Sequence, residues 1–112
     1  MIEVPAYTHS GIYAIHNETR GLWYIGSSYN IRQRAKSHKV KLERGIHSNQ
    51  ALQAAYNAGD VLTFSIIRKM GNASTYDVLE AEKQEIRAHD SFMNGYNQRI
   101  PHEWTDKIEG AS

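Results

Sequence analysis

SGIYAIH at residues 10–16 and LWYIGS at residues 22–27 are the two stretches of this sequence that decide its fold. Both are short and rich in aromatic and β-branched side chains, and the polar segment NETRG at residues 17–21 separates them. Two such runs joined by a turn predict a β-hairpin. The run VLTFSIIR at residues 61–68 has the same character, so a third strand is expected there.

Helix signals lie between these strands. Asn30 is a suitable N-cap for a helix that runs to about Arg44 and stops at Gly45. A wheel of about 3.6 residues per turn places one buried stripe on this helix. The stripe contains Ile31, Ala35, His38 and Leu42.

Two more helices are expected further along the chain. Ser48 can cap a second helix that ends at Gly59, and Ser74 followed by Asp77 predicts the start of a third. The resulting order of elements is ββααβα. This order predicts an α+β fold, in which helices pack around a small, three-stranded, mainly antiparallel sheet.

The length of 112 residues fits one domain, and the sequence contains no internal repeat. We assign residues 1–100 to this domain and the polar, acidic stretch 101–112 to a tail or the start of a linker. The chain has no cysteine, which excludes disulfides and thiolate-based zinc sites. Residues 1–10 lack the features of a signal peptide, and no apolar run approaches about 20 residues, so we expect a cytoplasmic protein without a membrane span.

Positive charge is concentrated on the first predicted helix. Between residues 32 and 44 the sequence has six basic residues and one glutamate, although the net charge of the whole chain is only +1. Such a segment indicates a surface that binds a polyanion, but an ordinary solvated helix face carries similar charges. The six candidate residues are Arg32, Arg34, Lys36, Lys39, Lys41 and Arg44.

Glu82 breaks the apolar pattern of the third predicted helix. It lies beside Val78 and Leu79 on the stripe that is expected to face inward. A lone buried carboxylate is costly, so Glu82 either reaches solvent at the edge of the core or has a cation as its partner. Mg²⁺ is often held by one or two carboxylates together with water and phosphate oxygens, so the functional interpretation of Glu82 is a metal ligand.

His38 is a polar residue on the apolar stripe of the basic helix. An inward-facing histidine is often a hydrogen-bonded core residue. Arg34 precedes it by one turn, so both side chains project from nearly the same face. A cation beside a histidine at the edge of a cleft suits a phosphate group, which needs charge neutralisation and hydrogen-bond donors. Core packing and phosphate binding both remain open for this pair.

Tyrosines are frequent in and beside the hairpin, at Tyr13, Tyr24 and Tyr29. Strand tyrosines usually pack with the ring half-buried and the hydroxyl at the surface, so by themselves they indicate a core role. The six histidines include no pair with the close spacing of zinc ligands, which argues against a zinc site.

Two tripeptides of the hairpin, GIY at residues 11–13 and YIG at residues 24–26, carry a resemblance to a known family. The second continues as YIGSSYNIRQRAKSH, which includes Arg34 and His38. Glu82, His47 and Asn97 match further positions of the family pattern. In these motifs the sequence resembles the GIY-YIG nucleases, and in particular the catalytic domain of phage intron-encoded homing endonucleases. The resemblance covers about residues 10–97.

The resemblance implies an endonuclease that hydrolyses phosphodiester bonds in DNA. Tyr13 would act as the general base or orient the attacking water, and Tyr24 would assist it. Arg34 would neutralise the charge that develops on the phosphorane. His38 would contact the phosphate or tune Tyr13.

The resemblance also implies a metal ion and a shared surface. Glu82 would hold one divalent ion, Mg²⁺ or Mn²⁺, and this ion would stabilise the leaving 3′ oxygen. His47 and Asn97 would support the site. We expect Arg34, His38 and Glu82 to converge on one concave surface against the tyrosine hairpin.

Double-stranded DNA is the partner that the resemblance implies, and we expect a monomer that works inside a bacterial host, as a phage-encoded protein does. The chain lacks the extended DNA-binding region of homing endonucleases, so target specificity would come from a following domain or a partner protein. Two alternatives stay open: a repair or recombination nuclease that acts on branched or damaged DNA, and a catalytically silent DNA-binding module of the same fold.

Overall fold

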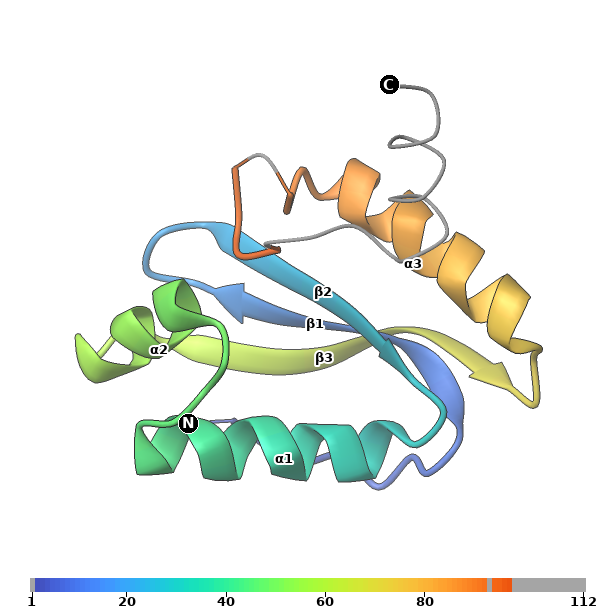
Figure 1. The fold of residues 1–112 in the computed structure, drawn as a ribbon, viewed down its shortest axis with the longest axis horizontal. Coiled ribbons are helices and arrows are strands. Elements are labelled where there is room, and N and C mark those ends of the chain that lie inside the picture. Colours follow the sequence, from blue (N-terminus) through green and yellow to red (C-terminus); the bar gives the residue numbers. More distant parts are fainter. Residues whose placement is uncertain (1, 93, 98–112) are drawn as a thin grey trace.

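A computed structural model of the chain describes residues 2–92 and 94–97. The predicted tail at residues 101–112 lies outside the described residues. The elements are β1 (Ser10–Asn17), β2 (Leu22–Ser28), α1 (Ile31–Arg44), α2 (Gln50–Asn57), β3 (Leu62–Gly71) and α3 (Thr75–Ala88). Their order confirms the predicted ββααβα arrangement and α+β class (Figure 1).

The three strands form one sheet in the order β2-β1-β3, and β1 pairs antiparallel with both neighbours. The hairpin turn is built around Asn17, whose side-chain oxygen accepts hydrogen bonds from the backbone N–H groups of Thr19 and Arg20. Within the hairpin, Tyr13 lies directly opposite Gly26. A side chain at Gly26 would collide with the Tyr13 ring, so the absence of one lets the tyrosine lie across β2.

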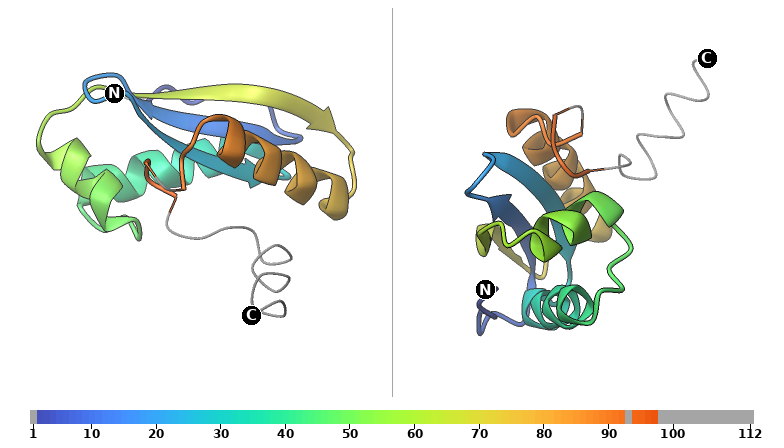
Figure 2. Two further views of the ribbon diagram at one scale, coloured as in Figure 1. Left: turned by 90° about the horizontal axis from the view of Figure 1, so that it is seen from above. Right: turned by 90° about the vertical axis from the view of Figure 1, so that its left-hand side faces the viewer.

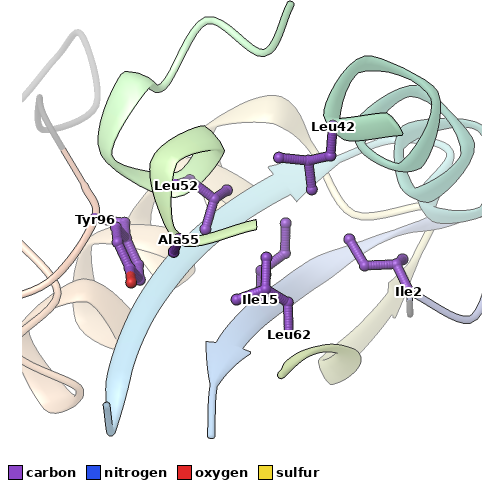
Figure 3. Close-up of a cluster of buried hydrophobic side chains, with 7 residues drawn as sticks. All are labelled: Ile2, Ile15, Leu42, Leu52, Ala55, Leu62 and Tyr96. Carbon is purple, nitrogen blue, oxygen red and sulfur yellow. The ribbon is translucent and has the colours of Figure 1, made fainter. Parts of the chain in front are cut away.

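Helices cover both faces of the sheet, and each face has its own core (Figures 1 and 2). On one face, α1 and α2 pack against β1 and β3. The buried residues of this core are Ile2, Ile15, Leu42, Leu52, Ala55, Leu62 and Tyr96 (Figure 3). On the other face, α3 packs against the hairpin. The buried residues of that core are Ile12, Ala14, Ile25, Val78, Ala81 and Ile86.

The predicted ends of α1 are confirmed. The Asn30 side chain accepts a hydrogen bond from the backbone N–H of Gln33, and Gly45 adopts a left-handed conformation (φ 75°) that ends the helix. Ser74 caps α3 in the same way, by accepting from the N–H of Asp77.

The predicted start of α2 is wrong by one residue. Asn49 is the N-cap in place of Ser48, because the Asn49 side chain accepts from the N–H of Leu52 while its amide nitrogen donates to the carbonyl of Tyr96. The helix ends at Asn57 instead of continuing to Gly59. The predicted third strand starts one residue later than expected and runs on to Gly71.

The segment after α3 returns to the hairpin and lies along β2. The backbone N–H of Tyr96 donates to the carbonyl of Trp23. The Asn97 side chain accepts from the N–H of Ile25 and donates to its carbonyl, both at 2.8 Å. No helix in the described part of the chain is long and apolar enough to cross a membrane.

Candidate active site

A buried chain of three side chains forms the centre of the site. The Tyr13 hydroxyl lies 2.7 Å from His38 Nε2, and His38 Nδ1 lies 2.7 Å from His47 Nε2. The two imidazole rings are stacked, with centroids 5.0 Å apart. The structure thus joins Tyr13 of β1, His38 of α1 and His47 of the α1–α2 loop into one hydrogen-bonded group.

The fold explains why these groups meet. Tyr13 points to the face of the sheet that α1 covers, and His38 lies on the buried stripe of α1. His47 is held in place by Gln53 of α2. The Gln53 side-chain oxygen accepts a hydrogen bond from the His47 backbone N–H, and its side-chain nitrogen donates to the carbonyl of Leu42. The loop that carries His47 is therefore tied both to the end of α1 and to α2.

Tyr24 lies beside this chain. Its ring centroid is 6.4 Å from that of Tyr13 and 5.6 Å from that of His38, and the two phenols are hydrogen-bonded to each other. Burial, followed by the neighbouring Tyr24, raises the pKa of Tyr13 well above its ordinary value, and the positive charge of Arg34 opposes this rise. A phenolate at Tyr13 thus needs hydrogen-bond donors and cations near it.

Both histidines favour the neutral form. Burial, followed by the nearby His47, Arg34 and Lys41, lowers the pKa of His38 to about 3. Burial is also the main cause that lowers the pKa of His47, followed by Lys41. Neither imidazole carries a positive charge at neutral pH.

Glu82 approaches from the other side of the sheet. Its Oε1 accepts a hydrogen bond of 2.5 Å from the Ser27 hydroxyl, and Ser27 follows Gly26 on β2. Burial raises the pKa of the Glu82 carboxyl, while the Ser27 hydrogen bond and the charge of Arg34 lower it. Its helix α3 packs on the opposite face of the sheet from Tyr13, yet the Glu82 charge is one of the causes that raise the pKa of Tyr13. The convergence of Arg34, His38 and Glu82 on one surface stays a prediction.

Arg34 connects the two sides. Its side chain is exposed on α1, and its charge acts on the Tyr13 phenol, on His38 and on the Glu82 carboxyl. It also borders a cavity of about 250 Å³ at the end of β2, where α1 and α3 come together. The cavity is lined by Ser10, Ser27, Ser28, Tyr29, Arg34, Ala73, Thr75, Val78 and Leu79.

Comparison with known proteins identifies this arrangement. The family model described as the GIY-YIG catalytic domain matches residues 9–97. The chain belongs to the GIY-YIG family. The resemblance drawn from the two tripeptides is confirmed, and with it the assignment to the endonucleases.

Relatives of known function support the same assignment. The chain is 36% identical over 89 residues to intron-associated endonuclease 1 of Enterobacteria phage T4. This match covers 79% of this chain and 36% of that protein. The GIY-YIG chain thus spans about a third of that relative's length.

Two solved structures have the same fold. One is the catalytic domain of homing endonuclease I-TevI, with a TM-score of 0.72 and 35% identity, covering 79% of this chain and 96% of that one. The other is a glutamate-to-alanine variant of that catalytic domain, with a TM-score of 0.74 and 33% identity, covering 82% of this chain and 95% of that one.

The basic residues of α1 in this GIY-YIG domain divide into two groups. The cations exposed on α1 are Arg34, Lys36, Lys41 and Arg44, while Lys39 is half-buried. Arg32 differs from them because its guanidinium donates to the carbonyl of Pro5 and holds the N-terminal segment against α1.

Sequence reasoning does not single out two polar residues that build the site. Ser27 is the hydrogen-bond partner of Glu82, and Gln53 orients the loop that carries His47. Ser27 could have been found by strand alternation, because it lies on the same side of β2 as Ile25, which packs against α3. Gln53 is a buried polar residue beside Leu52 on a short helix, a weaker signal. Asn97 forms hydrogen bonds with the backbone of Ile25 on β2 and of Ser91, so it acts as a strand clamp, and its predicted support of the site stays a prediction.

Proposed function

We propose that this GIY-YIG domain cuts double-stranded DNA by metal-assisted hydrolysis at a site that straddles the end of β2. The observation that carries the proposal is the cavity at the end of β2, which Arg34 lines together with Ser27, the hydrogen-bond partner of Glu82. A phosphate bound to Arg34 would have a phenol on one side and a carboxylate on the other. This is the arrangement that in-line attack on phosphorus requires, with separate groups for the attacking and the leaving oxygen.

Tyr13 is the group best placed to handle the attacking water. Its oxygen is held by His38, and its ring is fixed by stacking on Phe64, with centroids 4.9 Å apart. Its raised pKa means that the free domain holds the phenol, so an approaching cation is needed to favour the phenolate. Tyr24 would assist through its hydrogen bond to the Tyr13 hydroxyl.

Arg34 is the group best placed to bind the phosphate. Its guanidinium is exposed and adjoins the cavity at the end of β2. A planar guanidinium can donate two parallel hydrogen bonds to phosphate oxygens. It would neutralise the additional charge that develops on the phosphorane.

Glu82 is the candidate ligand for a divalent metal ion, as the family resemblance implies. The described residues contain no group of three histidine, cysteine, aspartate or glutamate side chains that could hold a metal ion. The Glu82 carboxylate and the Ser27 hydroxyl are hard oxygen donors, and this set fits Mg²⁺ or Mn²⁺ bound chiefly through water and phosphate oxygens. When bound, such an ion supplies Lewis-acid stabilisation of the leaving 3′ oxygen.

The exposed cations of α1 would hold the DNA backbone beside the site. Phosphate contacts of this kind position a protein on DNA but do not distinguish one base sequence from another, so target specificity would come from a following domain or a partner protein. We place the domain at residues 1–100 and regard residues 101–112 as a polar tail or the start of a linker.

The test is nicking of a supercoiled plasmid with Mg²⁺, with Glu82→Gln as the diagnostic variant and Glu43→Gln as its control. Both changes remove one negative charge, but Glu43 lies exposed on α1. We expect Glu82→Gln to lose cleavage and keep its affinity for duplex DNA, while Glu43→Gln cuts normally. Mg²⁺-dependent cleavage by Glu82→Gln would refute the metal-ligand role, and a wild-type protein that binds but never cuts would indicate a silent module.

A parallel set of intact, nicked and branched substrates separates homing-like cutting from repair-like cutting. Preferential cleavage of branched DNA would replace the duplex substrate in the proposal, without changing the chemistry.

A further inference from the structure

The backbone at Asn49 fixes the direction of a hydrogen-bond chain that ends at Tyr13. The Asn49 N–H donates to His47 Nδ1 at 3.0 Å. A backbone N–H always carries its hydrogen and can only donate. His47 Nδ1 must therefore be unprotonated, and the hydrogen of the neutral ring must lie on Nε2.

The same argument applies to the ring of His38. His47 Nε2–H faces His38 Nδ1 at 2.7 Å, so His38 Nδ1 is the acceptor. The hydrogen of His38 then lies on Nε2, which faces the Tyr13 oxygen at 2.7 Å. A second proton on either ring would place two hydrogens in one short contact.

The surroundings support neutral rings. The charged groups whose influence reaches the pair are Lys41, which acts on both histidines, and Arg34, which acts on His38. Both are cations, and burial disfavours charge on the rings as well. Within the described residues, the rings of Tyr13 and Tyr24 also contact His38, in edge-on arrangements with interplanar angles of 60° and 72°.

We propose that His47, oriented by the Asn49 backbone N–H, is a positioning residue that makes His38 a hydrogen-bond donor to the Tyr13 oxygen and prevents it from acting as the base for Tyr13. The catalytic consequence rests on the proposed role of Tyr13, whereas the direction of the chain is a property of the free protein.

This direction determines where the Tyr13 proton goes. Both nitrogens of His38 are already engaged, so the Tyr13 hydroxyl hydrogen points to its other partner, Tyr24. When the Tyr13 O–H bond breaks, the proton passes along Tyr24 to solvent water. The electron pair stays on the Tyr13 oxygen, where the His38 N–H stabilises it.

The first experiment reads the tautomers directly. Protein labelled with ¹⁵N at histidine is studied by two-dimensional NMR at neutral pH, because protonated and unprotonated ring nitrogens have well-separated shifts. We expect His38 and His47 each to have a protonated Nε2 and an unprotonated Nδ1. A hydrogen on Nδ1 of either ring overturns the proposal, whether or not the protein cuts DNA.

The second experiment tests the consequence with two variants of similar size. His47→Gln keeps an N–H donor toward His38, and His47→Leu removes it. Loss of the donor leaves His38 Nδ1 as a buried acceptor without a partner, so we expect single-turnover cleavage by His47→Leu to fall by about tenfold to a hundredfold with little change in KM.

The His47→Gln variant should retain clearly more of the wild-type rate, and its His38 spectrum should match that of the wild type. In His47→Leu, part of the His38 signal should move to the tautomer protonated at Nδ1. Equal rates for the two variants, with both folded by thermal melting, overturn the proposal. If the wild-type protein shows the expected tautomers but does not cut DNA, the proposed function fails and the assigned direction of the chain stands.

Discussion

Gly26 offers a sharp test of how the site is packed. A methyl group added there would lie 2.3 Å from the Tyr13 hydroxyl oxygen and 2.4 Å from its ring carbon Cζ. Ordinary contacts begin at about 3.4 Å, so the ring would have to retreat by about 1 Å. Tyr13 has little room to move, because it is 1% exposed, stacked on Phe64 and hydrogen-bonded to His38.

We expect Gly26→Ala to lose both stability and activity. Overpacking of this kind costs about 1–3 kcal/mol, and a weakened buried hydrogen bond adds about 1 kcal/mol. For a domain of this size a loss of about 2 kcal/mol lowers the melting temperature by about 10 °C. A displacement of about 1 Å in the site is enough to reduce cleavage by about a hundredfold.

Urea unfolding and plasmid nicking measure the two effects, and a double-mutant cycle with Tyr13→Ala isolates their cause. Without the tyrosine ring the added methyl has free space, so the stability cost of Gly26→Ala should shrink in that background. Wild-type stability and cleavage in Gly26→Ala would refute the packing argument. An equal stability cost with and without Tyr13 would assign the defect to the strand itself.

Three further predictions follow from the described contacts. The folded state lowers the pKa of His38 to about 3, so the stability contribution of the neutral ring is present above about pH 6.5 and is lost as the pH falls from there toward 3. The free energy of unfolding should therefore decrease less steeply over this pH range in His38→Gln than in the wild type. Four cations are exposed on α1, so the logarithm of duplex affinity should fall with the logarithm of salt concentration at a slope of about −4. A slope near zero would exclude this helix as the DNA-binding face. Asn97→Ala leaves the N–H and carbonyl of Ile25 without their partner and should cost about 2 kcal/mol in urea unfolding, whereas the exposed Asn94→Ala should cost little.

The sequence predicts the fold well because its local signals agree with the tertiary structure. Asn30, Gly45 and Ser74 are at the helix ends where their capping chemistry indicates. The error at Ser48 has a physical reason. Ser48 and Asn49 are both good N-caps, and the choice between them depends on the contact of Asn49 with Tyr96, which is distant in sequence.

The candidate site is harder to predict, because its geometry depends on which face each element covers. Periodicity alone identifies Glu82 and His38 as polar residues on inward stripes. It does not reveal that they approach from opposite faces of the sheet, nor that Ser27 is the partner of Glu82. The direction of the histidine chain depends on one backbone N–H, a group that every residue except proline has, so no pattern of side chains indicates it.

The Asn97 clamp also occupies part of the outer edge of β2. An outer strand normally offers a row of N–H and carbonyl groups to which a strand of another molecule can add. At Ile25 the Asn97 amide takes both of these groups, and at Trp23 the backbone of Tyr96 takes the carbonyl. The residues after α3 thus occupy backbone groups of β2 to which a strand of another molecule could otherwise pair.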